Sequence, residues 1–214
     1  MEEPHPLRTI LESAARGRFP KADGSIQVFP SPPGKSQAVC GFTAHHVISA
    51  NVSHEEVLER IDPSDLGAAL NPTFVTWLGR RLEAAPGSLD VVLAAPGLPD
   101  PPDGLLRESL PVEHARVSRA ERYREQVAVY TAVNGEAVVV LGRGLAGRRE
   151  VSLEIEEAAR GRGLGRRLLL GARALIPEGD VVFAQVAPGN AASLRAFLAA
   201  GFRPIGSEVL FLTS

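Results

Sequence analysis

The sequence predicts an α/β protein, of the α+β kind, in which short strands alternate with helices. Apolar and β-branched runs of strand length are bounded by Gly and Pro. Other segments repeat apolar residues at helical spacing behind a capping residue. Asn134-Gly135, between two apolar runs, is the strongest hairpin signal in the chain. With 214 residues, the chain can form one large domain or two small ones.

Composition argues against several classes of protein. The net charge is −2, which gives no basic surface of the kind that binds nucleic acid. Cys40 is the only cysteine, so neither an intrachain disulfide nor a multi-cysteine zinc site can form, and we expect no metal. No apolar run approaches the roughly 18 residues of a membrane span, and the N-terminus does not resemble a secretory signal. We therefore expect a cytoplasmic protein that binds neither nucleic acid nor membranes.

The first part of the chain has helix and strand signals in mixed order. Ser53 with Glu56 matches a capping box, and Pro86 with Gly87 ends a helix. The expected elements are a helix over Leu7–Arg18, a strand over Ser25–Phe29, a strand or hairpin over Gln37–Ala50, a helix from Ser53 to about Ile61, a helix over Thr73–Ala84 and a strand over Leu89–Ala95.

A proline-rich stretch follows. Residues 95–106 contain four prolines, which cannot donate hydrogen bonds to a sheet. We predict a linker over residues 99–112. It would join an N-terminal half, residues 1–98, to a second domain, residues 113–214.

The second half reads as a β-β-β-α-β-α-β-β series after a short helix. The expected elements are a helix over Ser118–Glu125, strands over Val127–Val133, Ala137–Leu141 and Glu150–Glu156, a helix from about Gly165 to Leu175, a strand over Val181–Val186, a helix from the Asn190 cap to Ala200, and strands over Phe202–Ile205 and Val209–Leu212. Gly142–Gly147 is expected to turn the chain between two of the strands.

A similar pattern occurs in both halves. Residues 78–82 (LGRRL) precede residues 90–94 (DVVLA), and residues 164–168 (LGRRL) precede residues 180–184 (DVVFA). Duplication and chance similarity in an Ala-, Leu-, Gly- and Arg-rich chain both explain the pattern. The N-terminal half is therefore either a degenerate copy of the second half or a variable segment.

The strongest chemical signal is the glycine loop between a predicted strand and a predicted helix. Gly161, Gly163 and Gly165 permit close backbone approach, and successive N–H groups at a helix start can hold phosphate oxygens. Four arginines, Arg160, Arg162, Arg166 and Arg167, add positive charge. This arrangement favours a pyrophosphate cradle over a plain connector.

Another glycine pattern matches the dinucleotide fingerprint in form only. Gly142-x-Gly144-x-x-Gly147 follows a strand, but the next residues alternate as a strand rather than forming the helix that the fingerprint needs. We interpret it as a hairpin loop. A nucleotide-dependent oxidoreductase is the alternative that this pattern leaves open.

Two motifs resemble a known family. Arg160-x-x-Gly163-x-Gly165 is similar to the first signature of GNAT-superfamily N-acetyltransferases. Asn190-x-x-Ser193-x-x-x-Phe197-x-x-x-Gly201-Phe202 is similar to the second, in family order and spacing. The resemblance covers roughly residues 127–214. It implies a GNAT-like mixed, mainly antiparallel twisted sheet flanked by helices, with a GNAT-like or variable N-terminal half.

The resemblance also implies acetyl-CoA as cosubstrate. Backbone N–H groups of the glycine loop would hold the pyrophosphate, and the strand that ends near Ile155 would pair with the pantetheine arm where it splays from the Val181–Val186 strand. The Asn190 side chain would reach the arm, although a helix N-cap is its simpler role; Ser193 would touch the cofactor or lie on a helix face. The residues expected to bind the cofactor are Leu153, Ile155, Arg160, Gly161, Arg162, Gly163, Leu164, Gly165, Arg166, Asn190 and Ser193.

The acid and base of the reaction are not evident. Where the family often has a Glu and a Tyr, this chain has Gln185 and Phe197, which do not titrate. The remaining candidates are Tyr130, Glu154 and Glu156; core packing for Tyr130 and a solvated strand face for the two glutamates are the alternatives.

We therefore expect an acetyl-CoA-dependent N-acetyltransferase, a monomer or homodimer. It would transfer the acetyl group to a primary amine of a small molecule or peptide by direct attack. A non-catalytic acyl-CoA-binding module is the alternative that Gln185 and Phe197 favour.

Overall fold

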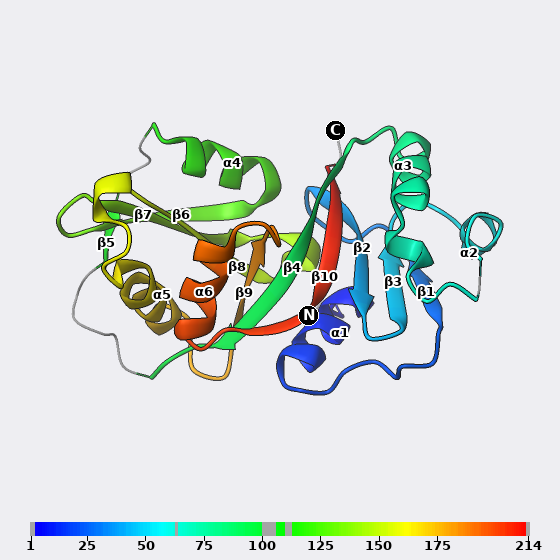
Figure 1. Cartoon of the computed structure of the whole chain (residues 1–214), viewed down its shortest axis with the longest axis horizontal. Coiled ribbons are helices and arrows are strands. Elements are labelled where there is room, and N and C mark those ends of the chain that lie inside the picture. Colours follow the sequence, from blue (N-terminus) through cyan, green and yellow to red (C-terminus); the bar gives the residue numbers. More distant parts are fainter. Residues whose placement is uncertain (1–2, 63, 100–105, 110–112, 213–214) are drawn as a thin grey trace. The chain divides into compact units, whose positions relative to one another are not determined.

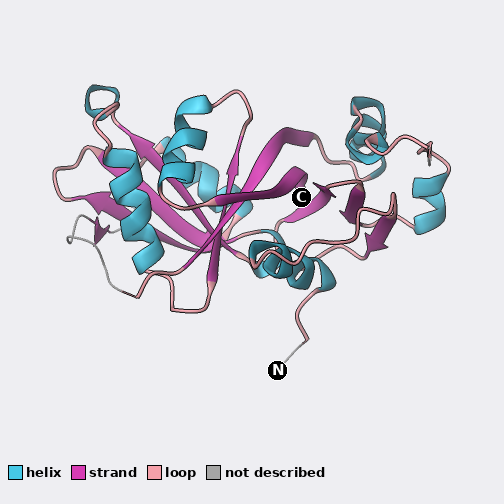
Figure 2. Cartoon of the chain, turned by 60° about the horizontal axis from the view of Figure 1, so that its bottom comes forward, coloured by secondary structure: helices cyan, strands magenta, loops and turns pink. Residues whose placement is uncertain are grey.

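The structure is a computed structural model that describes residues 3–62, 64–99, 106–109 and 113–212. The chain divides into two compact units. Unit 1 comprises Met1–Val92, Leu145–Gly147 and Ile205–Ser214; unit 2 comprises Leu93–Gly144 and Arg148–Pro204. Figure 1 labels the elements, and Figure 2 distinguishes helices from strands. Two strands, β4 (Pro86–Pro96) and β10 (Arg203–Leu212), begin in one unit and end in the other.

Among its described residues, unit 1 contains four strands in addition to β4. They lie in the order β1-β3-β2-β10, where β1 is parallel to β3 and the other two pairs are antiparallel. The elements that unit 1 contributes are α1 (Pro6–Ala15), β1 (Ile26–Phe29), β2 (Ser36–Phe42), β3 (His45–Ser49), α2 (His54–Leu58), the short η1 turn (Ala68–Leu70), α3 (Pro72–Arg81), the start of β4, the short η2 turn (Leu145–Gly147) and most of β10.

The core of unit 1 lies between α3 and the sheet. Phe74 and Leu78 of α3 are buried with Ile48 of β3 and Phe211 of β10. Gly79 is required there, because a Cβ would lie 2.8 Å from the Ala84 carbonyl oxygen.

The described part of unit 2 holds the end of β4 and five further strands, in the order β4-β9-β8-β7-β6-β5. The β5/β6, β6/β7 and β7/β8 pairs are antiparallel, and β8/β9 is parallel. Its elements are β5 (Leu106–Ser109), α4 (Ala115–Tyr123), β6 (Glu125–Ala132), β7 (Ala137–Arg143), β8 (Arg149–Ile155), the short η3 turn (Glu157–Ala159), α5 (Leu164–Ala174), β9 (Val181–Val186) and α6 (Ala191–Ala199).

Helices cover both faces of the unit 2 sheet. Val117 and Ala120 of α4 are buried against Val129 and Val140 of β6 and β7. Helix α5 packs against α6 and β8 on the opposite face (Figure 1). The expected mixed, mainly antiparallel sheet flanked by helices is confirmed.

Three expectations about the elements need correction. One strand, β5, forms inside the predicted linker and pairs with β6; residues 100–105 and 110–112 of that linker lie outside the described residues. Strand β4 starts at Pro86, before the expected start at Leu89; a proline is tolerated at the first position of a strand. The two expected C-terminal strands are one continuous strand, β10.

The similar patterns of the two halves fall on different parts of their helices. Leu78-Gly79-Arg80-Arg81 lies at the end of α3, whereas Leu164-Gly165-Arg166-Arg167 forms the start of α5. The strand arrangements also differ, because β1 and β3 are parallel while β6, β7 and β8 form an antiparallel series. Each pattern nevertheless leads from a helix into a strand, from α3 into β4 and from α5 into β9.

The hairpin interpretation of Gly142–Gly147 is confirmed by the antiparallel β7/β8 pair that flanks it. Positive φ occurs at Ala146 and Gly147 and not at Gly144. Gly144 is needed for space: a Cβ there would lie 2.2–2.3 Å from the carboxylate atoms of Glu150.

Candidate functional site

The candidate site is the place where β8 and β9 of unit 2 separate. The two parallel strands pair at Arg149–Val182 and at Glu150–Phe183. Strand β8 continues to Ile155 and β9 to Val186, but these described residues make no further pairs with one another. We refer to the Glu150–Phe183 pair as the vertex and to the opening beyond it as the splay.

Hydrogen-bond parity on β8 decides which backbone groups face the splay. The Glu156 amide donates to the Glu136 carbonyl at 2.9 Å, and the Gly144 amide donates to the Arg148 carbonyl at 2.9 Å. In an antiparallel pair, hydrogen-bonded positions alternate, so even-numbered residues of β8 bond to β7. Leu153 and Ile155 therefore direct their N–H and C=O groups away from β7, into the splay. The structure thus brings both predicted residues to an open strand edge.

Helix α5 begins next to the open end of the splay. Gly163 is its N-cap at φ 75° and offers no side-chain acceptor to the first turn. A Cβ on Gly161 or Gly163 would meet nothing within 4 Å, so open space surrounds both glycines. A Cβ on Gly165 would lie 3.3 Å from Ile155 Cδ1 and 3.4 Å from Ala196 Cβ, which fixes the helix start close to the end of β8.

The charge at this helix start is positive. Its first turn contains no acidic residue, and exposed N–H groups at a helix N-terminus carry the positive end of the helix dipole. Arg160 and Arg162 are exposed beside it. This arrangement fits a pyrophosphate: N–H donors without a competing cap, open space and positive charge.

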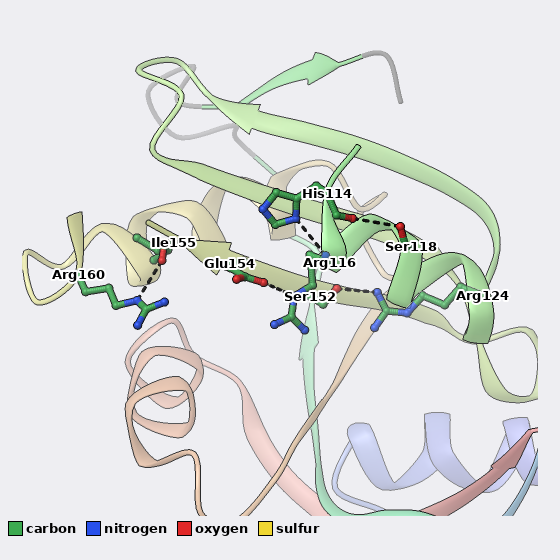
Figure 3. Close-up of polar contacts among 8 residues, drawn as sticks. All are labelled: His114, Arg116, Ser118, Arg124, Ser152, Glu154, Ile155 and Arg160. Carbon is green, nitrogen blue, oxygen red and sulfur yellow. Dashed lines mark hydrogen bonds and ion pairs between the residues drawn. The ribbon is translucent and has the colours of Figure 1, made fainter. Parts of the chain in front are cut away.

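Two of the loop arginines make local contacts. Arg160 donates from Nε to the Ile155 carbonyl oxygen at 3.0 Å (Figure 3). Arg166 donates from Nε to the Ala199 carbonyl oxygen at 3.0 Å and so ties α5 to the end of α6. Leu164, the first helical residue, is partly buried.

The second motif begins at the N-cap of α6. Asn190 Oδ1 accepts from the Ser193 amide at 3.1 Å, so the simpler role expected for Asn190 is present. Ser193 is partly buried on α6, and Phe197 packs edge-to-face on Phe202 at a centroid distance of 4.9 Å. Phe197 is thus a core residue of this motif.

The even-numbered side chains of β8 face α4. Arg116 donates to Glu154 at 3.3 Å, and Arg124 donates to Ser152 Oγ at 3.0 Å (Figure 3). Glu154 is 40% exposed. Since alternate residues of a strand point to opposite faces, Leu153 and Ile155 lie on the α5 side.

Glu154 and Glu156 line a cavity of about 190 Å³ together with His114, Ile155 and Arg160. The Nδ1 of His114 accepts from the Arg116 amide at 3.0 Å, which leaves the neutral ring with its proton on Nε2. Sequence reasoning missed His114. The helix was expected to begin at Ser118, three residues after its actual start at Ala115, so the capping position of His114 was not recognised.

Tyr130 lies away from the splay. It is on β6, opposite Val139 of β7, so β7 lies between Tyr130 and β8. Partial burial and then the charge of Glu108 raise the pKa of its phenol.

The vertex is held by a buried ion cluster. Glu150 accepts from Arg148 Nε at 2.8 Å and from Arg124 Nε at 2.9 Å, and all three residues are buried. Burial by itself raises the pKa of Glu150, but the two guanidinium charges outweigh it and lower that pKa overall. Arg148 also stacks over Phe183 at 5.3 Å, so the cluster joins both strands of the vertex.

Unit 1 contains a larger cavity of about 1350 Å³, lined by residues that include Asp23, Ser25, Gln27 and His45. Hydrogen bonds from Ser25, and then from His45, lower the pKa of Asp23 to about 2. His45 already has partners at both ring nitrogens, Ser25 and Asp23 at one and Gln27 at the other. The adjacent His46 lines a separate cavity, as expected for neighbouring residues of a strand.

Comparison with known proteins shows similarity to solved structures. The chain is similar to GNAT-family acetyltransferases. An acetyltransferase of this family from Novosphingobium aromaticivorans is 22% identical, with a TM-score of 0.42 over 60% of this chain and 64% of that one. One from Colwellia psychrerythraea is 11% identical, with a TM-score of 0.38 over 67% and 63% of the two chains.

A tandem GNAT protein from the clavulanic acid biosynthesis pathway is 12% identical, with a TM-score of 0.36 over 64% of this chain and 57% of that one. No family model and no curated protein matches the sequence. The match spans less than two thirds of the length of these three proteins, so activity, substrates and partners are proposals for this chain.

Among the residues that the structure describes, no helix is long and apolar enough to cross a membrane. In the same part of the chain, no three His, Cys, Asp or Glu side chains are grouped as the ligands of a metal ion would be.

Proposed function

We propose that this protein is an acetyl-CoA-dependent N-acetyltransferase. The observation that carries the proposal is the open edge of β8: the outward backbone groups of Leu153 and Ile155 lead to the uncapped start of α5 at Gly163. A strand edge can pair with an amide-containing arm, and a helix N-terminus can hold phosphate. Together they match a CoA thioester along its length.

Different residues would bind the pyrophosphate and the pantetheine arm of the CoA thioester. Amides of Leu164, Gly165 and Arg166 would hold the pyrophosphate, and Arg162 would add charge. The Leu153 and Ile155 backbone groups would pair with the pantetheine arm, for which Arg160 would have to release the Ile155 carbonyl. Asn190 would keep its capping bond and orient the start of α6 beside the arm.

The proposed reaction is a direct acyl transfer to a primary amine. The amine nitrogen forms a bond to the acetyl carbonyl carbon, the carbon–sulfur bond breaks, and the amine proton is balanced by protonation of the departing thiolate. Positioning of the two reactants can supply a large share of the rate, about 7–11 kcal/mol in favourable systems. Glu154, with His114 beside it in the same cavity, is our candidate to move the proton, directly or through water.

A non-catalytic acyl-CoA-binding module is the second candidate. Gln185 and Phe197 favour it, because neither can titrate where the family often has an acid or a base. Both candidates require a CoA thioester to bind, and they differ in turnover.

Calorimetry with acetyl-CoA and a thiol-release assay with a panel of primary amines test both candidates. We expect binding and amine-dependent thiol release. Binding without release by any amine would favour the module, and absence of binding would reject both candidates.

A further inference from the structure

Gln185 of β9 carries a buried hydrogen-bond donor without a partner. Its Nε2 is inaccessible to solvent and has no partner among the described residues. A buried polar group left unpaired costs about as much as a lost hydrogen bond, so such groups are rare and call for an explanation.

The face on which Gln185 lies follows from its neighbour two positions earlier. The Phe183 ring contacts Arg148, whose Nε bonds to Glu150. Phe183 therefore lies on the Glu150 face of the sheet, and Gln185 shares that face because side chains of a strand alternate. On β8, Ser152 and Glu154 project to the same side.

The position of Gln185 along the splay is also defined. The vertex pair is Glu150–Phe183, so Gln185 lies two residues past the vertex, about 7 Å along β9. Its counterpart by register would be Ser152, but the strands have already separated there. Gln185 thus lies on β9, on the side of the splay opposite β8 and near its closed end.

The direction of the bound thioester determines what lies opposite Gln185. In the proposed function, the pyrophosphate lies at the start of α5, which is next to Ile155 at the open end. An arm that follows β8 inward from that point ends near the vertex. The acyl group, rather than the nucleotide, is therefore the part of the ligand that reaches Gln185.

We propose that the Gln185 side-chain amide donates a hydrogen bond to the carbonyl oxygen of the bound thioester. This inference rests on the proposed function. Attack by the amine moves negative charge onto that oxygen, and a buried, preorganised donor stabilises the charge. The amide does not titrate, so its contribution is independent of pH. Removal of one such donor lowers kcat by about a hundredfold or more in other enzymes.

The test compares acetyl-CoA with CoA, because only acetyl-CoA has the carbonyl. Gln185→Leu and Gln185→Met both remove the donor, and the second keeps the length of the unbranched side chain. We expect each variant to bind acetyl-CoA at least about tenfold more weakly by calorimetry and to bind CoA within about twofold of the wild type. In the infrared spectrum of bound ¹³C-carbonyl acetyl-CoA, the carbonyl band should return toward its frequency in the absence of the hydrogen bond.

Ser36→Ala is the matched control, because Ser36 Oγ in unit 1 is also buried and has no hydrogen-bond partner in the part of the chain that the structure describes. It should change neither affinity. Equal loss of both ligands in the Gln185 variants, or an unchanged carbonyl band, would overturn the Gln185 assignment while leaving the proposed function in place. A wild-type chain that binds neither ligand would reject the proposed function and the assignment with it.

Discussion

Glu150 of β8 and Phe183 of β9 are the last two residues that pair these parallel strands. Arg148 joins them a second time, with an ion pair to Glu150 and a cation–π contact to Phe183. The point at which the splay begins is therefore held by buried side chains as well as by the backbone. That point defines the closed end of the splay, where the acyl group of the proposed ligand would lie.

The first prediction concerns Gly163. In Gly163→Ala, the positive φ of 75° would strain the backbone and the new methyl group would project into the space next to the helix start. We expect at least a tenfold loss of CoA affinity, about 1.4 kcal/mol, by calorimetry.

Gly179→Ala is the control for backbone strain. Gly179 has a similar φ of 84°, and a Cβ there also meets nothing within 4 Å. It should lose comparable stability and keep its CoA affinity. Equal affinities in the two variants would contradict the pyrophosphate cradle.

The second prediction is that Gly144 is required because a side chain would not fit there, and not because of its backbone conformation. Gly144→Ala would place Cβ against the Glu150 carboxylate at the vertex. Because overpacking typically costs about 1–3 kcal/mol, we expect a loss of that size in chemical denaturation. Gly189→Ala, with open space and no positive φ, should be close to neutral. Equal stability of the two variants would show that the cluster rearranges freely.

The third prediction concerns the pH dependence of stability. Glu150→Gln leaves Arg148 and Arg124 buried without their carboxylate, and we expect a loss of about 3–5 kcal/mol at neutral pH. The pKa of Glu150 is lower in the folded protein than in the unfolded chain. Its contribution is therefore fully present above the unfolded pKa and disappears as the pH falls through the folded pKa.

Denaturation at several acidic pH values checks this sign. The stability of Glu150→Gln should depend less on pH in that range than that of the wild type. Glu154 lies on the same strand and the same face as Glu150, in a partly exposed ion pair with Arg116. Glu154→Gln should therefore lower the free energy of unfolding by less than about 1 kcal/mol. A similar cost for both substitutions would contradict the buried-cluster interpretation.

The sequence predicted local features better than long-range pairing. The capping box at Ser53 and Glu56 is present, with both bonds formed, because each depends on residues three positions apart. The hairpin at Asn134-Gly135 is present for the same reason. The parallel pairing of β1 with β3, and the passage of β4 and β10 from one unit to the other, depend on contacts between distant segments that local patterns do not encode.

Local features of the candidate site were also predictable. The glycine loop precedes α5 and Asn190 caps α6, as the short motifs predicted. Tyr130 was a candidate only as one of two tyrosines, and the strand order places β7 between it and β8. His114 was missed because the helix was expected to begin at Ser118, whereas α4 begins at Ala115 and has His114 as its N-cap.

The fourth prediction follows from the strand that returns to unit 1. Residues Ser207–Leu212 of β10 pair with Gly41–Ser36 of β2. A protease recognition sequence inserted after Asp103 should therefore yield two fragments that co-elute in size-exclusion chromatography after cleavage. Separation of the fragments without denaturant would contradict the pairing of β10, in the second fragment, with β2, in the first.

The last prediction tests the candidates for proton transfer against one another. Tyr130→Phe should change kcat by less than about threefold, under 1 kcal/mol, because β7 separates the phenol from β8. Partial burial and then the charge of Glu108 raise the pKa of the phenol, so it keeps its proton at neutral pH as an ordinary tyrosine does, and its position on β6 is the reason for this expectation. Glu154→Gln should lower the rate more, since Glu154 lies on the splaying part of β8 beside His114. With wild-type protein, the rate should rise with pH along the ionisation of the acceptor amine. A hundredfold drop for Tyr130→Phe with CoA affinity intact would make the phenol the general acid and contradict this assignment.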